Sequence, residues 1–139
     1  MMGKINYFKN EHSFLSNFYP VQITIDGITY RSVEHAYVAM KTLDIEIRKK
    51  ISLMDRPGEV KKFGRTIQLR SDWDHVKLPL MMGLLCIKFQ NPELKLMLKS
   101  TGSDYLEEGN WWGDTFWGVC HGIGENNLGK LLMQIRSQI

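Results

Sequence analysis

The sequence predicts a mainly helical α+β fold over residues 1–139, with small β-hairpins in the N-terminal third and near residues 105–119. Three observations lead to this prediction. A chain of 139 residues has the usual size of one domain and can bury its own core. Apolar and polar residues alternate around a single Asp-Gly turn. Much of the remaining chain has apolar residues at helical spacing, behind Ser, Asn or Pro residues that start helices.

The strand pattern is clearest in the N-terminal third. A short strand is expected at residues 5–8, and a polar and aromatic loop at residues 12–20. Residues 21–25 then alternate, and Asp26-Gly27 is a two-residue turn signal. This turn places the apolar residues of 21–25 and 28–30 on one face of a hairpin.

Helix signals follow the hairpin. Ser32 is a suitable N-cap, and Asn91-Pro92 is a cap followed by a first-turn proline. Pro79 interrupts a long helical pattern, which predicts a kink or two helices there. Cys86 falls within the apolar pattern and is expected to be a buried thiol. Helices are expected at residues 33–43, 45–53, 57–66, 71–89 and 92–101 and from residue 127 onward, and the buried stripe of 71–89 is expected to be Val76, Leu80, Leu84 and Ile87.

The composition excludes several classes of protein. The chain is 43% hydrophobic and 24% charged, which is typical of a globular domain. It has no apolar run long enough for a membrane span and no apolar signal sequence at its start. Its two cysteines and four scattered histidines have no metal-ligand spacing. We therefore expect no metal, no cofactor and a cytoplasmic location.

Charge is distributed unevenly along the chain. The net charge is +3, but residues 100–129 contain five acidic residues and no Lys or Arg. Cations and carboxylates therefore lie in different elements, as a site for a phosphorylated substrate requires. Two differently charged solvated faces would give the same pattern.

One expected helix carries a candidate acid and a candidate amine. Glu34 and Lys41 are seven residues apart, so they share a helix face about two turns from one another. The intervening face is largely apolar, which favours a partly enclosed site. Alternatively, Glu34 is a first-turn acid stabilised by the helix dipole. The adjacent His35 points elsewhere and is expected to be packed or hydrogen-bonded.

A tryptophan-rich segment, residues 110–118, is a second candidate. Asp114 lies between aromatic rings, where its pKa can be perturbed, and flat rings suit stacking on a base or sugar. The alternative is cross-strand aromatic pairing around a turn Asp, with strands at 105–107 and 116–119 joined across 109–114.

Two weaker signals concern anions. Residues 61–65 are basic, with further Lys and Arg downstream, and suit phosphate binding or a solvated face. Residues 122–129 form a glycine-rich start of the last helix that can approach an anion closely, although they lack GxGxxG and the P-loop lysine.

Short motifs follow one another along nearly the whole chain. They are Phe14-Leu15-Ser16-Asn17-Phe18, Ser32-Val33-Glu34-His35-Ala36-Tyr37 with Lys41, Gly64-Arg65, Trp73 with Lys77 and Met81, Lys88-Phe89-Gln90-Asn91, Leu98-Lys99-Ser100-Thr101-Gly102, Asp114-Thr115-Phe116-Trp117-Gly118 and Gly124-Glu125-Asn126-Asn127-Leu128-Gly129. In this order and spacing they resemble the YbiA-like or NADAR family.

The resemblance implies a compact, largely helical fold with a small β component, and N-glycosidase chemistry without a metal. It implies two substrate classes, namely phosphoribosylamino-pyrimidine intermediates of riboflavin biosynthesis and ADP-ribose attached to guanine in nucleic acid. Both reactions hydrolyse a bond from ribose C1 to nitrogen. The expected partner is thus a phosphorylated ribosyl small molecule or ADP-ribosylated nucleic acid, without a membrane or an obligate protein partner.

The reaction assigns a role to each candidate residue. Breaking the C1–N bond builds positive charge on the sugar, which a nearby carboxylate stabilises. Glu34 is the preferred base or electrostatic partner, with Asp114 as the second candidate. Lys41 protonates the leaving nitrogen or traps the ring-opened aldehyde as a Schiff base. The expected substrate-binding residues are Asn17 and Asn126 for ribose hydroxyls or water, Arg65, Lys77 and Lys88 for phosphate, Trp117 or Trp73 for stacking, and Phe18 and Gly118.

Two non-catalytic functions remain as alternatives. One is an ADP-ribose or nucleotide reader that has the same pocket without turnover. The other is a single-strand nucleic-acid binder with Trp111 and Trp112 as stacking platforms.

Overall fold

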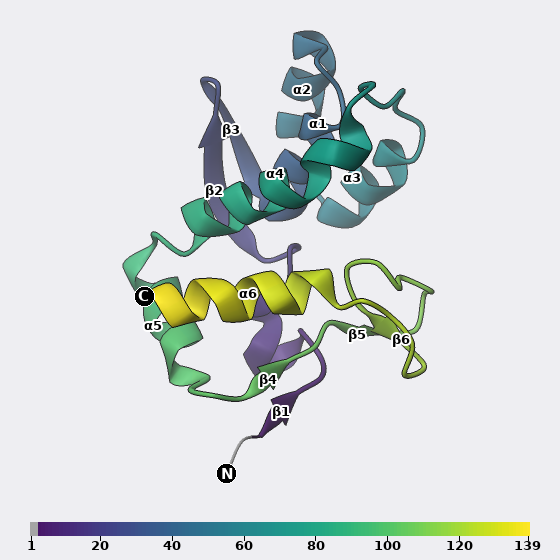
Figure 1. The fold of residues 1–139 in the computed structure, drawn as a ribbon. Coiled ribbons are helices and arrows are strands. Elements are labelled where there is room, and N and C mark those ends of the chain that lie inside the picture. The colour runs from purple at the N-terminus through teal and green to yellow at the C-terminus, as the bar shows by residue number, and fades with distance from the viewer. Residues whose placement is uncertain (1–2) are drawn as a thin grey trace. The chain divides into compact units, whose positions relative to one another are not determined.

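The structure is a computed structural model that describes residues 3–139, and it confirms the mainly helical α+β class (Figure 1). The chain forms two compact units, Asn17–Lys88 and a second unit of Phe89–Ile139 with the described residues up to Ser16. One domain over residues 1–139 stays a prediction, of which residues 1–2 lie outside the described part. No helix within residues 3–139 has the length and apolar character needed to cross a membrane.

The unit Asn17–Lys88 begins with the expected hairpin. Strands β2 (Pro20–Ile25) and β3 (Ile28–Ser32) pair antiparallel. Asp26 and Gly27 both have positive φ, at 52° and 79°, as a two-residue hairpin turn requires. Ile23 pairs with Tyr30, and both side chains are fully buried. The predicted register is therefore confirmed.

Helix α1 (Val33–Met40) follows the hairpin directly and is almost entirely buried. The Ser32 hydroxyl caps it by accepting a hydrogen bond from the backbone N–H of His35 at 3.1 Å. The same hydroxyl lies 2.7 Å from His35 Nδ1, while His35 Nε2 lies 2.9 Å from the carbonyl oxygen of Met54. His35 is thus a hydrogen-bonded core residue, as expected, and burial lowers its pKa.

Three further helices pack against α1 within this unit, namely α2 (Ile45–Ser52), α3 (Pro57–Gly64) and α4 (Trp73–Lys88). Asp44 caps α2 by accepting hydrogen bonds from two backbone N–H groups, and Pro57 occupies the first turn of α3. The predicted ends of α2 and α3 lie within two residues of those observed.

Helix α4 is continuous and contains Pro79, so the expectation of two helices is wrong, whereas the expected kink stays a prediction. The helix begins at Trp73 rather than Ser71. Its buried residues are Trp73, Met81, Leu84, Leu85 and Lys88, whereas the predicted stripe shares only Leu84 with this set. The buried face is set by contacts with both α1 and β2, so it admits a Trp and a Lys that apolar periodicity passes over. Cys86 lies off this face and is exposed, not buried.

The second unit also differs from the prediction in places. Residues expected in a loop form the 3-10 helix η1 (Asn10–Leu15), whose Phe14 and Leu15 are buried. This helix contacts α5 (Pro92–Ser100), which Asn91 caps as expected by accepting from two backbone N–H groups. The last helix is α6 (Asn127–Gln138).

The hairpin predicted near residues 105–119 is not formed. Strand β4 (Tyr105–Leu106) pairs in parallel with β1 (Lys4–Ile5), and β5 (Gly109–Asn110) pairs in parallel with β6 (Val119–Cys120). The pattern was misleading because side-chain hydrogen bonds within residues 108–117 hold the chain in an irregular loop in place of a strand pair.

Substitution Ser32→Ala is expected to lower the free energy of unfolding by about 1–2 kcal/mol, because the change removes the α1 cap and a partner of buried His35. Urea denaturation measures the change. Ser71→Ala is the matched control at an exposed position outside α4, with an expected change within about 0.5 kcal/mol. Equal stability of the Ser32 variant and the native chain would contradict the capping role.

Candidate functional site

The predicted site residues fall in both units, and most of them lie in Asn17–Lys88. The residues in that unit are Asn17, Phe18, Glu34, Lys41, Arg65, Trp73, Lys77 and Lys88, and those in the second unit are Asp114, Trp117, Gly118 and Asn126.

Lys41 is the centre of the cluster in Asn17–Lys88. It follows the last residue of α1, and its amine is partly buried. Burial lowers the pKa of Lys41, the positive charges of Arg65 and Lys77 lower it further, and the charge of Glu34 raises it. Glu34, Arg65 and Lys77 are therefore near enough to act on Lys41 electrostatically. The electrostatic effect of Glu34 on Lys41 agrees with the expectation that the two residues lie on the same side of this helix.

Helix α3 brings Arg65 to this cluster through a close packing contact. Gly64 is buried against α1, and a Cβ there would lie 3.0 Å from both methyl groups of Val38 and 3.5 Å from Lys41 Nζ. Any larger residue would push α3 away from α1 or displace the amine. The sequence analysis assigned no role to Gly64. Its position directly before Arg65 was the one signal that could have indicated a role in placing Arg65.

An aromatic ring lies near the amine of Lys41. Lys41 Nζ lies 5.7 Å from the ring centre of Tyr37, within the range of a cation–π interaction. The ring of Tyr37 in turn meets that of Trp73 on α4, with centres 5.2 Å apart and planes tilted by 54°. Trp73 is buried, so Tyr37 and the core occupy much of its surface. Its place is typical of a wall of the site rather than an open stacking platform.

Asn17 presents an acceptor beside Glu34. The backbone N–H of Glu34 donates to the carbonyl oxygen of Asn17 at 3.0 Å. The Asn17 amide nitrogen donates to Met81 Sδ at 3.8 Å, which orients the amide. Its Oδ1 atom is buried and accepts no hydrogen bond from residues 3–139. Such an atom suits a ligand hydroxyl.

Three lysines of this unit differ in their neighbours and in their exposure to solvent. Lys77 lies 3.6 Å from Asp74, one turn earlier on α4. Lys61 lies 5.9 Å from the ring centre of exposed Phe18. Lys88 is 0% exposed, and burial lowers its pKa to about 7. A lysine in this setting loses its charge near neutral pH, and its predicted role as a phosphate ligand stays a prediction.

In the second unit, Asp114 organises its own loop. Its Oδ1 accepts hydrogen bonds from the backbone N–H groups of Phe116 at 3.1 Å and Trp117 at 2.9 Å. Asn110 donates to the Asp114 carbonyl oxygen and accepts from its N–H. The ring of Trp117 meets Phe116 edge-on at 4.8 Å. The Asp114 carboxylate therefore has an architectural task, and its catalytic role stays a prediction.

Asn126 and Gly118 fit the same loop onto α6. Asn126 is 2% exposed, and its amide bonds to the N–H of Glu108 and to the carbonyl oxygen of Leu106 at 3.0 and 2.9 Å. A Cβ at Gly118 would collide with Glu108 and come within 2.7 Å of Asn110 Nδ2. Both residues are built into the fold, and their contribution to substrate binding stays a prediction.

The anion site suggested for the start of α6 is not present. The backbone N–H groups of residues 125–128 donate to the carbonyl oxygens of residues 115–118, at 2.8 to 3.2 Å. The donors that would hold an anion are thus used to fix the Asp114 loop.

Two exposed tryptophans flank this loop. Trp111 and Trp112 meet edge-on with ring centres 5.6 Å apart. The surrounding segment, residues 100–129, has no Lys or Arg to bind a phosphate backbone. Within residues 3–139, no three His, Cys, Asp or Glu side chains are grouped to hold a metal ion.

Comparison with known proteins identifies the family. The model of the NADAR domain matches residues 6–139. The chain belongs to the NADAR family. N-glycosidase YbiA of Escherichia coli is 36% identical over 97% of this chain and 88% of its own length. An N-glycosidase of Nostoc punctiforme is 38% identical over 89% of this chain and 83% of its own length.

Other relatives are larger proteins. A riboflavin biosynthesis protein of Vibrio vulnificus is 35% identical over 92% of this chain, which spans only 36% of that protein. The solved NMR structure of E. coli YbiA has the same fold, with a TM-score of 0.87 and 35% identity over 99% of this chain and 86% of the other. The family, the fold and the N-glycosidase class expected from the motifs are thereby confirmed.

The electrostatic coupling in this NADAR chain predicts opposite effects of two substitutions on Lys41. Lys77→Met removes a positive neighbour and is expected to raise the pKa of Lys41, whereas Glu34→Gln removes a negative one and is expected to lower it. NMR titration of the Lys41 amine measures both. Lys62→Met, an exposed charge change on α3, is the control. Shifts of the same sign in both variants would contradict the cluster.

Burial of Lys88 predicts an unusual dependence of stability on pH. Its pKa is about 7 in the folded chain and 10.5 ordinarily, so the unfolded chain binds more protons between these values. The Lys88 contribution to the free energy of unfolding therefore rises with pH across this window. Lys88→Met is expected to lack this rise in urea denaturation, whereas exposed Lys130→Met keeps it. Identical pH slopes for the native chain and Lys88→Met would refute the effect.

Proposed function

We propose that the chain is an N-glycosidase that hydrolyses the bond from ribose C1 to nitrogen in a phosphorylated riboside. The observation that carries this proposal is the partly buried amine of Lys41 among Glu34, Arg65 and Lys77. A carboxylate suits a sugar that becomes positive at C1, and two cations suit the phosphate that the sugar carries. The names of the NADAR relatives support the reaction class.

Glu34 acts on the reacting sugar in this proposal. The capped start of α1 and the hydrogen bond to Asn17 hold its backbone in place. From that position its carboxylate stabilises the positive charge at C1 or takes a proton from the attacking water. Asn17 Oδ1 supplies an acceptor for a ribose hydroxyl in this proposal.

Lys41 has two possible tasks, which depend on its protonation. As the charged ammonium it donates a proton to the leaving nitrogen. As the neutral amine, which its lowered pKa favours, it attacks C1 of the ring-opened glycosylamine, whose C1 is still bound to the base nitrogen. The base leaves as its free amine and a Schiff base forms between C1 and Lys41, which water then hydrolyses to the sugar aldehyde and the free lysine. Lys41→Arg separates these tasks, because arginine keeps the charge and cannot form the Schiff base.

The substrate is either of the two classes that the family resemblance implies. Relatives named as riboflavin biosynthesis proteins favour a phosphoribosylamino-pyrimidine intermediate as the first candidate, with ADP-ribosylated guanine in nucleic acid as the second. Trp73 is buried and in contact with Tyr37, which leaves its ring little free surface for stacking on a base. A cytoplasmic location stays a prediction from the sequence.

A paired hydrolysis assay read by mass spectrometry tests the proposal. One arm offers the phosphoribosylamino-pyrimidine and the other offers an oligonucleotide with ADP-ribosylated guanine. We expect base release in the first arm, reduced about 10²- to 10⁴-fold by Glu34→Gln. Lys41→Arg is expected to abolish release if the Schiff base is required. Glu46→Gln, an exposed carboxylate on α2, is the matched control and is expected to retain full activity.

The other outcomes are equally specific. Release in the second arm alone identifies a de-ADP-ribosylating enzyme. Activity that survives Glu34→Gln shifts the catalytic assignment to Asp114. Ligand binding without release in either arm, by the folded chain, supports the non-catalytic reader instead.

A further inference from the structure

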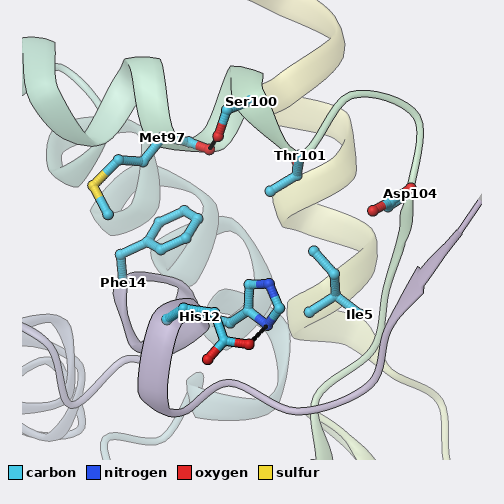
Figure 2. Close-up of a pocket in the computed structure, with 8 residues that line it drawn as sticks. Ile5, His12, Phe14, Met97, Ser100, Thr101 and Asp104 are labelled. Atoms are coloured by element: carbon cyan, nitrogen blue, oxygen red, sulfur yellow. Dashed lines mark hydrogen bonds and ion pairs between the residues drawn. The ribbon is translucent and has the colours of Figure 1, made fainter.

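A cavity lies in the second unit, away in sequence from Glu34 and Lys41. Its volume is about 270 Å³, and residues of η1, β1, α5 and the turn before β4 line it (Figure 2). The residues that line it are Ile5, Glu11, His12, Phe14, Met97, Ser100, Thr101 and Asp104. The site predictions and the proposed mechanism use none of these residues.

The floor of the cavity is apolar and partly aromatic. Ile5 and Phe14 are both buried, and Met97 lies beside them on α5. Figure 2 shows the rings of Phe14 and His12 bordering the same space. Flat faces of this kind favour a planar ligand, which stacks on or packs edge-on against them.

Two carboxylates lie at different edges of the floor. Glu11 Oε1 accepts a hydrogen bond from the Tyr7 hydroxyl at 2.6 Å, and this bond lowers the pKa of Glu11. Asp104 Oδ1 accepts from the backbone N–H of Gly3 at 3.0 Å. Each carboxylate is thus anchored through one oxygen, and each has a second oxygen that can accept from a ligand. The cavity thus offers two anchored acceptors.

Most of the remaining polar groups at the cavity interact with other residues of the chain. Arg136 donates to Thr101 Oγ1 at 2.9 Å and interacts electrostatically with Asp104. The ring of His12 packs on Tyr7 with centres 5.0 Å apart. His12 Nδ1 is buried 3.8 Å from Glu11 Oε1 and has no hydrogen-bond partner within residues 3–139. None of the eight lining residues is Lys or Arg.

We propose that this cavity binds a small planar heterocycle that carries amino groups. Carboxylates accept hydrogen bonds from exocyclic amines, as Glu and Asp do from the amino edge of cytosine. A volume of about 270 Å³ lies just below the usual range for drug-sized ligands and so suits a single ring or a fused pair. The proposed reaction releases a base of this class. Only the suggestion that this released base is the ligand rests on the proposed function, because the binding site itself is argued from the cavity.

NMR titration of the full chain with 2,4-diaminopyrimidine tests the proposal. We expect backbone amide shifts at Ile5, Met97 and Thr101 and a Kd of about 1 mM or tighter. The comparison compound, 2,4-dimethylpyrimidine, has the same shape without the amine donors and is expected to bind at least about 10-fold more weakly. Equal shifts with both compounds, or none at about 10 mM, would overturn the proposal.

Variants separate the cavity from the rest of the chain. Glu11→Gln and Asp104→Asn are each expected to weaken binding at least about 5-fold, and Glu93→Gln, an exposed carboxylate on α5, leaves it unchanged. Ser100→Trp fills the cavity without altering a carboxylate and is expected to abolish binding. Unweakened binding in that variant, shown to be folded by circular dichroism, would refute the location.

Glu34→Gln serves as an independent check. Its binding of the diaminopyrimidine is expected to equal that of the native chain, because Glu34 does not line the cavity. If the native chain releases no base in either arm of the hydrolysis assay while it still binds the diaminopyrimidine, the proposed function fails and the cavity assignment stands. Loss of binding in Glu34→Gln would refute the cavity as the site.

Discussion

The placement of a lysine amine among packed helices is the constraint on which the unit Asn17–Lys88 depends. An ammonium group loses hydration when it is partly buried, and the neighbouring charges of Arg65 and Lys77 add repulsion. The fold tolerates this arrangement because α1, α3 and α4 are fixed by contacts that do not involve the amine. Gly64 lets α3 approach α1, and Trp73 joins α4 to α1 through an aromatic contact. The cluster of charges around Lys41 is thereby held by packed helices.

The second unit uses its polar residues differently. The side chains of Asp114 and Asn126 form hydrogen bonds with backbone groups. The backbone N–H groups at the start of α6 donate to the carbonyl oxygens of residues 115–118. An irregular loop of this kind contains few regular backbone hydrogen bonds, so side-chain bonds replace them. The motif Asp114–Gly118 is accordingly a structural element in its own right, whatever its contribution to a ligand.

Local signals in the sequence predicted the hairpin, the helix caps and the helix order, because turn glycine, Ser32 and Asn91 act on their immediate neighbours. Tertiary contacts decided what local signals could not. The buried face of α4 includes Lys88, and the parallel pairing of β1 with β4 joins segments about a hundred residues apart. The motifs indicated Glu34 and Lys41 correctly as neighbours. They could not indicate that Gly64 leaves room for the Val38 side chain and the Lys41 amine, or that the Asp114 carboxylate accepts hydrogen bonds from its own loop.

The placement of Cys86 has a practical consequence. It is exposed on the same helix as Lys77, whereas Cys120 is buried, so the native chain presents one reactive thiol on a rigid scaffold. A maleimide dye or a spin label therefore attaches at a single known point without any engineered cysteine. The label then sits in the unit that contains Lys41, while every side chain of the candidate site keeps its natural identity.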